Sequence, residues 1–245
     1  MLSREGNQVP QISPQSRSDD VRHMFSRIAN HYDRANRWMT WGQDVKWRRE
    51  VLRLAQLPAG GSLLDVGSGT GDLASNALQF DHPGFIVAAD FTTEMIQVGR
   101  SRQGGGSICW VNADAMRLPF PPGSFDAVVS GYLLRNVVDL GRTLAEQYRL
   151  LKWGGRMVNL DTSPPPGDLW HLPTRLYLRH VIPMIGRLVS GESDAYSYLS
   201  QTTERFASAD NLAVEMEKVG FREVKYRRFM GGSMAIHWGV KLPGQ

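Results

Sequence analysis

The chain has 245 residues, of which 42% are hydrophobic and 21% are charged, so we expect one globular domain with additions rather than two full domains. Its single cysteine, Cys109, excludes an internal disulfide framework and a cysteine-rich metal site, and we expect no bound metal. The net charge is +4, and the basic residues are clustered. Because acids alternate with these bases and no nucleic-acid-binding module is recognisable, nucleic acid is not an expected partner.

The N-terminal segment, residues 1–18, is polar and contains Pro10 and Pro14. It lacks the apolar core of a signal peptide, and we expect a disordered leader there, followed by a domain at 19–245. No apolar run elsewhere reaches the length of a membrane span. We therefore expect a cytoplasmic protein, and the basic clusters favour a membrane surface, at its inner face, as the second interpretation after solvated faces.

Two helices are expected ahead of the first strand. Asp19 and Asp20 stand where they would cap a first helix whose apolar residues have helical spacing. A second helix is expected from about Lys46 to Leu57, ended by Pro58. Because both precede the sheet, we expect residues 19–60 to form an appended helical cap.

From Ser62 onward, short apolar runs alternate with helical patterns, which indicates an α/β fold with a mostly parallel sheet covered on both faces. Gly231 and Gly232 join the last two strands as a hairpin, so an antiparallel edge is expected to end the sheet, and Lys152–Gly155 are expected to form a turn. The expected strands are Leu63–Val66, Phe85–Ala89, Ser107–Val111, Phe125–Val129, Arg156–Leu160, Glu223–Phe229 and Ser233–Val240, and the expected helices lie near Leu73–Gln79, Thr93–Arg102, Leu140–Leu151 and Asn211–Val219.

A long insertion follows the fifth strand. Three consecutive prolines, Pro164–Pro166, open it, and it spans roughly 168–207. Its apolar residues are interleaved with histidines and arginines. Such a helix packs in a core or, in the sharper interpretation, forms a lid or interfacial helix that admits an apolar substrate.

The glycine-rich turn after the first strand, Asp65–Asp72, is the strongest local signal. Glycines at 67, 69 and 71 permit a tight bend and a close ligand approach. Asp72 occupies the third glycine position of a dinucleotide fingerprint, and the lysine of a P-loop is missing, so phosphate ligands are disfavoured. An acid, Asp65, just before a turn with Gly67, Gly69 and Gly71 instead suits a ligand with a cationic amine and no phosphate, such as S-adenosylmethionine; a strand-turn-helix without a ligand is the alternative.

Acids close the next two strands. Asp90, followed by Phe91, stands where an acid binds both ribose hydroxyls of a nucleoside; a cap of the next helix is the alternative. Asp114 could accept a hydrogen bond from an adenine amino group, with Ala115 supplying backbone contacts. An Asp-initiated turn explains Asp114 equally well.

The fourth loop, Ser130–Asn136, follows the fourth strand, where a methyl group would meet its acceptor. Arg135 and Asn136 are therefore the best candidates for catalysis, against the alternative of a surface pair. Tyr32 is a candidate to close over the site, or else a core residue. The alternative bases are His31, His180 and His237.

Several motifs stand in a fixed order along the chain: Tyr32-Asp33…Asn36…Met39…Gly42…Trp47, Leu64–Asp72, Ala89-Asp90, Asp114-Ala115…Leu118-Pro119-Phe120, Leu134–Val137, Leu151–Gly155 and Ser197-Tyr198-Leu199. In these motifs the chain resembles the ubiquinone/menaquinone biosynthesis C-methyltransferase family from about Val21 to Lys241. The resemblance implies a Rossmann-like class I S-adenosylmethionine-dependent fold, with seven strands of which the last is antiparallel. It also implies methylation of a ring carbon on a prenylated benzoquinol or naphthoquinol.

Carried over by position, the resemblance implies that Thr70, Asp90, Asp114, Ala115 and Gly131 bind the cofactor. Arg135 and Asn136 would lie at the acceptor, where we expect the arginine to stabilise a phenolate and the asparagine to orient it or a relay water. The chain departs from the family at Leu133, where a glycine is usual, at Gly131, where serine is common, and at Asp161-Thr162-Ser163, where Glu-Phe-Ser is usual.

Three other functions remain open at this point. The nearest is methylation of another small aromatic or polyketide acceptor. The others are a nicotinamide oxidoreductase, which Asp72 disfavours, and a catalytically inactive subunit of a quinone-synthesis complex. A prenylated quinol is the expected substrate, and a homodimer is a further expectation.

Overall fold

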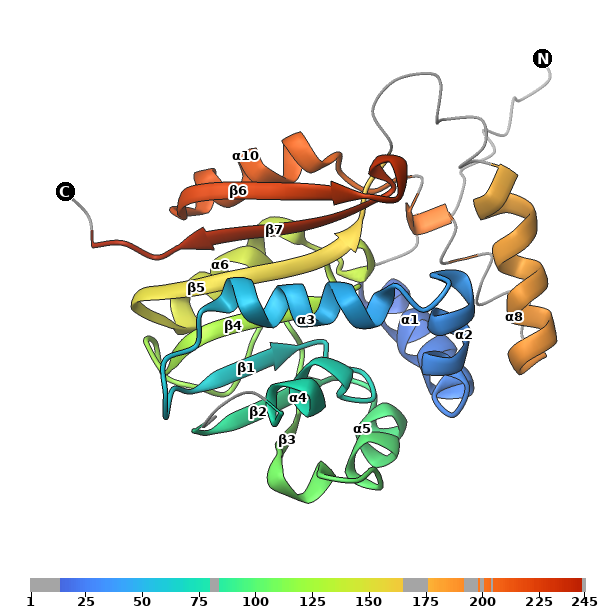
Figure 1. Cartoon of the computed structure of the whole chain (residues 1–245), viewed down its shortest axis with the longest axis horizontal. Helices are drawn as coiled ribbons and strands as arrows, with labels where there is room; N and C mark the ends of the chain where they lie inside the picture. The colour runs from blue at the N-terminus through green and yellow to red at the C-terminus, as the bar shows by residue number, and fades with distance from the viewer. Residues whose placement is uncertain are drawn as a thin grey trace, which may run out of the picture.

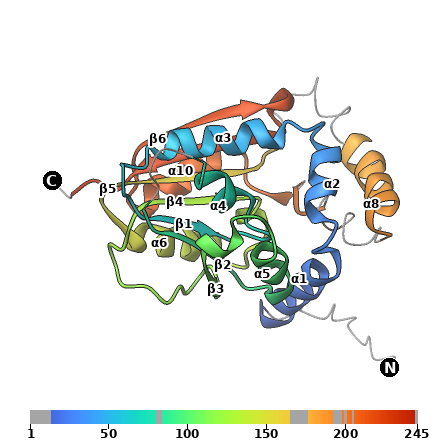
Figure 2. The same cartoon turned by 60° about the horizontal axis from the view of Figure 1, so that its bottom comes forward.

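The computed structural model describes residues 14–79, 84–164, 176–191, 198, 201–203 and 205–243. One seven-stranded sheet runs through the centre, and helices pack on both of its faces (Figure 1). Three helices, α1, α2 and α8, gather beyond one end of the strands (Figures 1 and 2). The expected α/β fold is therefore confirmed.

The strands are β1 (Leu63–Val66), β2 (Ile86–Asp90), β3 (Cys109–Asn112), β4 (Phe125–Gly131), β5 (Leu151–Thr162), β6 (Arg222–Phe229) and β7 (Met234–Val240). Their order in the sheet is β3-β2-β1-β4-β5-β7-β6. The first five strands pair in parallel, and β7 pairs antiparallel with both β5 and β6. The predicted antiparallel last strand is confirmed, but it lies inside the sheet, because β6 forms the edge.

The strand order reverses between β1 and β4. The two strands lie side by side, and the chain runs outward from them in opposite directions along the sheet. Ligands of open α/β sheets bind in the crevice at the carboxyl ends of the strands at such a switch point. All residues of β1 and β2 are buried, as expected for central parallel strands covered on both faces.

Apolar side chains divide the helices between the two faces of the sheet. On one face α3 (Asp44–Ala55), α4 (Asp72–Ala77) and α5 (Thr93–Arg100) contribute to a core that includes Trp47, Leu73 and Ile96. On the other face α6 (Leu140–Leu150) and α10 (Ala209–Val219) contribute Leu144, Leu212 and Met216 to a second core. The prediction that α3 belongs to an appended cap is thus wrong: it contacts β4, β5 and β7 as a covering helix.

Of the predicted cap, only α1 (Pro14–Ile28) and α2 (Tyr32–Met39) lie beyond the sheet, where Met24, Ile28 and Ala35 pack with Met95 of α5. Helix α1 begins at Pro14, so Asp19 and Asp20 lie inside it and do not cap it. Residues 1–13 of the expected leader are outside the described residues.

Two other local predictions differ from the structure. Gly105–Ser107 form a short 3-10 turn, η1, so β3 starts two residues later than expected. The expected turn at Lys152–Gly155 lies within β5 as an irregularity, where the register with β4 shifts and Gly154 adopts φ 81°. A glycine tolerates this left-handed conformation without the strain that a Cβ would cause.

The longest described stretch of the insertion contains the π-helical turn η3 (Tyr177–Val181) and α8 (Ile182–Ser190), which contact α2. Arg34 Nη2 donates to the Val189 carbonyl at 3.1 Å, and the Tyr177 hydroxyl donates to the Met39 carbonyl at 2.5 Å. The remaining parts of the predicted 168–207 insertion, 168–175, 192–197, 199–200 and 204, lie outside the described residues.

Candidate active site

A cavity of about 1010 Å³, a volume that includes its mouth open to solvent, lies at the carboxyl ends of β1, β2 and β4. Most of the residues that the sequence singles out line it, including the acid at the end of β2 and the acid in the loop after β3. These residues are Tyr32, Asp65, Gly67, Gly69, Thr70, Asp90, Phe91, Asp114, Ala115, Gly131 and Asn136. Gly71 and Arg135 do not line this cavity.

The three glycines of the turn all have positive φ, at 62°, 56° and 78°, but their surroundings differ. A Cβ on Gly67 would lie 2.6 Å from Leu133 Cδ1, and one on Gly71 would lie 2.3 Å from Trp110 Cη2. A Cβ on Gly69 would meet only Tyr32 Cε1, at 3.9 Å. Gly67 and Gly71 are therefore required by packing, whereas Gly69 leaves open space toward the cavity.

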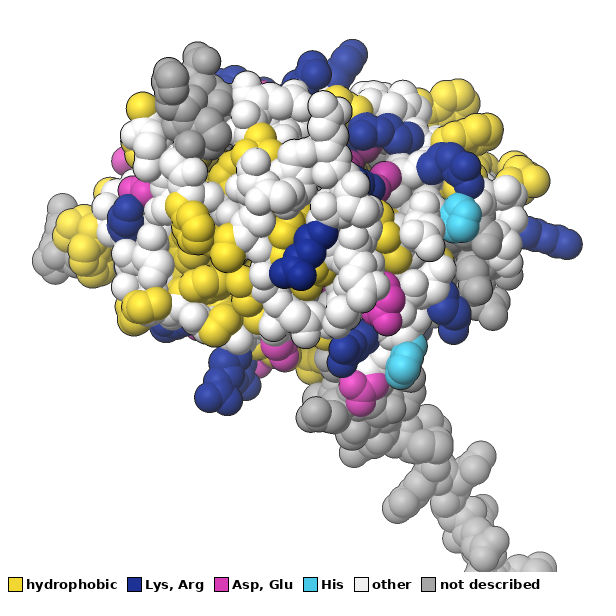
Figure 3. All heavy atoms as spheres, turned by 90° about the horizontal axis from the view of Figure 1, so that it is seen from below, with side chains coloured by type: hydrophobic (Ala, Val, Ile, Leu, Met, Phe, Trp, Pro, Cys, Tyr) yellow, Lys and Arg dark blue, Asp and Glu magenta, His cyan; other side chains and the backbone are white. Residues whose placement is uncertain are grey.

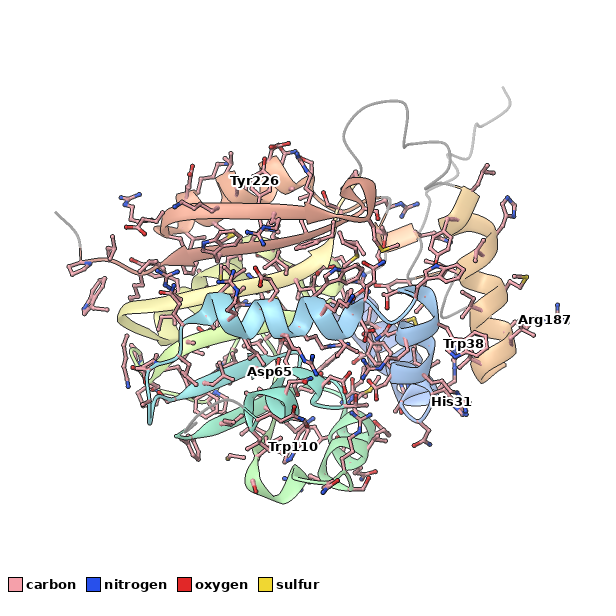
Figure 4. The ribbon with its side chains drawn as sticks, viewed as in Figure 1. His31, Trp38, Asp65, Trp110, Arg187 and Tyr226 are labelled. Carbon is pink, nitrogen blue, oxygen red and sulfur yellow. The ribbon has the colours of Figure 1, made fainter. Side chains whose placement is uncertain are left out.

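Asp65 is buried at the carboxyl end of β1, in the interior beneath α3 (Figure 4). Its Oδ2 accepts a hydrogen bond from Ala74 N at 3.1 Å, while Oδ1 has no partner among the described residues. Burial raises the pKa of Asp65 to about 8, against the lowering effects of Ala74 N–H and the Arg48 charge. A buried acceptor without a partner at the edge of a cavity is suited to a cationic ligand group.

Asp90 links the glycine turn to the end of β2. Its Oδ2 accepts from Gly69 N at 2.7 Å and its Oδ1 from Thr92 N at 2.8 Å. Asp90 therefore bonds the residue that precedes α5 (Thr93–Arg100) and no N–H group of the helix itself. Each carboxylate oxygen has a further lone pair, so Asp90 can still accept from a diol. Burial raises the pKa of Asp90, and the two backbone N–H groups oppose that rise.

Asp114 forms the turn that was the alternative to a binding role. Its Oδ1 accepts from Met116 N at 2.8 Å, and its carbonyl accepts from Arg117 N at 2.9 Å. Asp114 and Ala115 nevertheless line the cavity, with Phe91 also on its wall. The turn therefore presents these residues to the cavity rather than excluding them from it.

A second cavity, with about 650 Å³ of space, adjoins the first at Tyr132. Tyr132 lines both cavities, is buried and holds φ 62°. Arg135 lines the second cavity, which also receives side chains from the cap and the insertion. Those side chains are Asn36, Met39, Thr40, Tyr177 and Ile182.

Arg135 and Asn136 are neighbours in the chain but line different cavities. Arg135 Nη1 donates to Asp161 Oδ1 at 2.6 Å, its backbone N donates to Asp161 Oδ2 at 3.2 Å, and its guanidinium lies 5.1 Å from the Tyr132 ring centroid. Asn136 lines the first cavity and donates to the Tyr132 carbonyl at 2.8 Å. The alternative of a surface pair is wrong, because Arg135 is buried. Burial alone would lower the pKa of Arg135, but Asp161 raises it above its ordinary value.

Sequence reasoning missed an ion-pair network beside the glycine turn. Thr70 Oγ1 donates to Asp33 Oδ1 at 2.8 Å, and Asp33 also pairs with Arg102. Arg102 Nη1 forms a second ion pair, with Asp72 Oδ1 at 2.8 Å. The network also includes Arg37, Asp44 and Arg48. The spacing of Asp44 and Arg48, four apart on a helix, was the one signal that could have indicated it.

None of the three histidines considered as bases, His31, His180 and His237, lines either cavity. His237 is buried on β7, where its Nε2 lies 2.9 Å from the Ala209 carbonyl, and burial lowers its pKa to about 4. It is therefore neutral at pH 7, and it contributes to the wall of neither cavity.

The family model described as the ubiE/COQ5 methyltransferase family matches residues 13–241. The chain belongs to this family. It is 43% identical over 226 residues to the ubiquinone/menaquinone biosynthesis C-methyltransferase UbiE of Desulfotalea psychrophila, covering 92% of each chain. It is 39% identical over 218 residues to the demethylmenaquinone methyltransferase of Thermus thermophilus, covering 88% of this chain and 99% of that one.

Solved structures of methyltransferases share the fold. A phosphoethanolamine N-methyltransferase of Haemonchus contortus, in complex with S-adenosylhomocysteine, aligns with a TM-score of 0.66 at 16% identity, over 95% of this chain and 61% of that one. An S-adenosylmethionine-dependent methyltransferase of Thermotoga maritima aligns with a TM-score of 0.62 at 21% identity, over 90% and 99%. The predicted class I fold is confirmed.

This member of the ubiE/COQ5 family is a methyltransferase, and its cofactor is S-adenosylmethionine, as the sequence predicted. No helix in the described part of the chain is long and apolar enough to cross a membrane. Within those same residues, no group of three or more His, Cys, Asp or Glu side chains is arranged to hold a metal ion.

Proposed function

We propose that this methyltransferase transfers a methyl group to a ring carbon of a prenylated quinol, of the demethylmenaquinol or ubiquinone-precursor type. The names of the relatives at 34–43% identity support this acceptor class. The observation that carries the proposal is the second cavity, which meets the first at Tyr132 and contains a buried arginine. Two adjoining cavities provide separate room for a donor and for an acceptor with an apolar tail.

The first cavity is the proposed cofactor site. Asp90 would accept from the ribose hydroxyls, and Asp114 from the adenine amino group, with Phe91 and Ala115 beside the base. Asp65 has the unpartnered oxygen that fits the cofactor's ammonium group. The remaining proposed contributors shape the turn or the wall of the cavity: Gly67, Gly69, Thr70, Gly71 and Gly131.

The proposed chemistry depends on activation of the acceptor carbon. S-adenosylmethionine supplies an electrophilic methyl group, and alignment of two reactants can remove roughly 7–11 kcal/mol of the barrier. A phenol ring carbon becomes nucleophilic when the hydroxyl loses its proton. Arg135 Nε has no partner among the described residues and is the donor proposed to stabilise the resulting phenolate. Asn136 Oδ1, also unpartnered there, would orient the acceptor or a relay water, and Tyr32 would cover the site.

Labelled S-adenosylmethionine tests the proposal directly. Incubation with a demethylmenaquinol or a demethylated ubiquinol precursor should place the label on a ring carbon. Label on a ring oxygen, or no transfer although the cofactor binds, would refute C-methylation of quinols. Transfer that is equally fast to acceptors without a prenyl tail would instead favour another small aromatic acceptor.

We also propose a peripheral contact with an anionic membrane through one surface, defined by Trp38 of α2, by Trp41 just after it, and by Leu176, Met184 and Leu188 of the insertion. Trp41 is 79% exposed and Leu188 74%. Trp38 and Arg187 lie at the same end of the molecule (Figure 4). The view from below shows apolar side chains there among Lys, Arg and His (Figure 3).

The positive charge of this surface and its continuity with the second cavity favour a lipid membrane as its binding partner. Residues 169–191 contain no Asp or Glu but several basic residues, the pattern of an interfacial helix on anionic lipid. Tyr177 and Ile182 of the same segment line the second cavity, so a prenyl tail could pass from lipid to acceptor site.

Sedimentation with vesicles tests this contact. The protein should bind phosphatidylglycerol vesicles more tightly than phosphatidylcholine vesicles, and Leu188→Glu should weaken binding. Trp153→Ala, an exposed tryptophan at the far end of β5, is the matched control and should have no effect. Loss of a dimer on Leu188→Glu, without any vesicle binding by the parent protein, would show that a second copy covers this surface.

A further inference from the structure

Arg48 of α3 is a buried cation on the wall of the cofactor cavity, and nothing in the sequence motifs assigns it a role. Its side chain is only 5% exposed. It lines the first cavity together with Tyr32, Asp65 and Asp72. A buried arginine needs hydrogen-bond acceptors for its donors, so its partners determine what it can bind.

Most of the donor capacity of Arg48 is unused. Its Nη1 pairs with Asp44 on the same helix and with Asp72 Oδ2 at 3.3 Å. Its guanidinium lies 5.8 Å from the centroid of the Tyr132 ring. Among the described residues, Nη2 and Nε of Arg48 make no hydrogen bond. These nitrogens form one edge of a planar fork that fits the two oxygens of a carboxylate.

A complementary acceptor lies at the same end of the cavity. Arg48 is close enough to Asp65 for its charge to lower the pKa of that carboxyl, against the larger effect of burial. Asp65 Oδ1 is buried and unpartnered within the described chain. A cationic donor edge and an anionic acceptor side by side match a zwitterion, the form of the amino-acid portion of S-adenosylmethionine.

We propose that Arg48 binds the carboxylate of the cofactor's methionine portion, next to an ammonium held by Asp65. Asp44 and Asp72 hold the guanidinium in place through the opposite side of the fork. The inference rests on the cofactor and does not depend on the identity of the acceptor.

Two ligands that differ by the carboxylate alone test the assignment. Calorimetric titration compares S-adenosylhomocysteine with its decarboxylated analogue, which keeps the amine, the ribose and the adenine. Arg48→Gln should weaken S-adenosylhomocysteine about 10- to 100-fold, as expected for loss of a charge-assisted pair. The same variant should change the affinity for the decarboxylated analogue less than about threefold, because that ligand never contacts the guanidinium.

Arg102→Gln is the matched control. Arg102 belongs to the same ion-pair network, through Asp33 and Asp72, but does not line the cavity. Its replacement should weaken both ligands by the same factor, if it weakens either. An equal effect of Arg48→Gln on both ligands, or no effect on either, would overturn the proposal and leave Arg48 a structural residue.

If Arg48→Gln does not fold, Arg48→Lys tests the proposal instead. Lysine keeps the charge but loses the fork, so S-adenosylhomocysteine should weaken about tenfold and the decarboxylated analogue should not. If the parent protein bound neither ligand, the cofactor assignment itself would be refuted, which is distinguishable from failure of the Arg48 proposal.

Discussion

Thr70 and Asp33 lie 37 positions apart in the chain, and the Thr70 hydroxyl donates to Asp33 Oδ1 at 2.8 Å. The bond joins the glycine turn of the cofactor cavity to the first turn of α2. Because Asp33 also pairs with Arg102, which pairs with Asp72, three elements meet at one carboxylate. The position of α2 over the cavity is therefore coupled to the turn.

Asp33→Asn should loosen this connection. The change removes the charge that pairs with Arg102 while leaving an oxygen for Thr70, so the guanidinium keeps only Asp72. We expect faster hydrogen exchange in residues 32–39 and faster release of the cofactor. Glu50→Gln, which breaks surface ion pairs of α3 with Arg53 and with Arg227 of β6, is the control and should leave both rates unchanged. Unchanged exchange in Asp33→Asn would contradict a holding role.

The raised pKa of Asp65 predicts that cofactor binding depends on pH. In the ligand-free protein the carboxyl has a pKa of about 8, so it is mainly protonated at pH 6 to 7, whereas an ammonium ligand favours the carboxylate. Affinity for S-adenosylhomocysteine should rise from pH 6 toward pH 8, with release of a proton on binding. Titrations in two buffers of different ionisation enthalpy measure that proton.

The raised pKa of Asp65 makes protein stability fall with rising pH, whereas it makes cofactor affinity rise. The folded pKa of about 8 exceeds the ordinary value of 3.8, so the folded state binds more protons between these values. The ligand-free protein should therefore lose stability as the pH rises from about 4 to 8. Asp65→Asn should remove both pH dependences. A variant that retained them would place the titrating group elsewhere.

The glycines of the turn should respond differently to alanine. Gly69→Ala adds the strain of a left-handed residue, about 1–2 kcal/mol, in open space. Gly71→Ala adds a Cβ 2.3 Å from Trp110 Cη2, so an overpacking cost of about 1–3 kcal/mol should follow as well. Thermal unfolding should therefore show the larger loss for Gly71→Ala. Gly69→Ala, whose methyl group enters the approach to the cavity, should show the larger loss of cofactor affinity relative to its loss of stability.

The sequence predicted the parallel core because its signals are local. Leu63–Val66 is bounded by polar and glycine residues and became β1 with the predicted limits. Acids at strand ends, such as Asp90, were predictable as cavity residues because parallel strands present their carboxyl ends at one edge. Helix α3 was assigned to a cap because its position before the first strand says nothing about which surface its apolar face covers.

Long-range partners were not predictable. Asp33 meets Arg102 across 69 positions, and Arg135 meets Asp161 across 26, with no pattern in the chain that pairs them. Asp161 stands where the family usually has a glutamate, and the structure shows its role: it pairs with Arg135. Tyr132 escaped notice because its role arises from its position between two cavities.

The Arg135–Asp161 pair gives the sharpest test of the acceptor side. Arg135→Gln should lower kcat about 100-fold or more, as for loss of a preorganised donor, while the cofactor Kd changes less than about threefold. A buried pair that loses one partner costs about 3–5 kcal/mol of stability, so unfolding must be measured alongside. Asp161→Asn keeps a carbonyl oxygen for the guanidinium but misaligns Arg135. It should therefore lower kcat clearly while it reduces the free energy of unfolding less than Arg135→Gln does. A loss confined to cofactor affinity in Arg135→Gln would show that the second cavity is not where the acceptor binds.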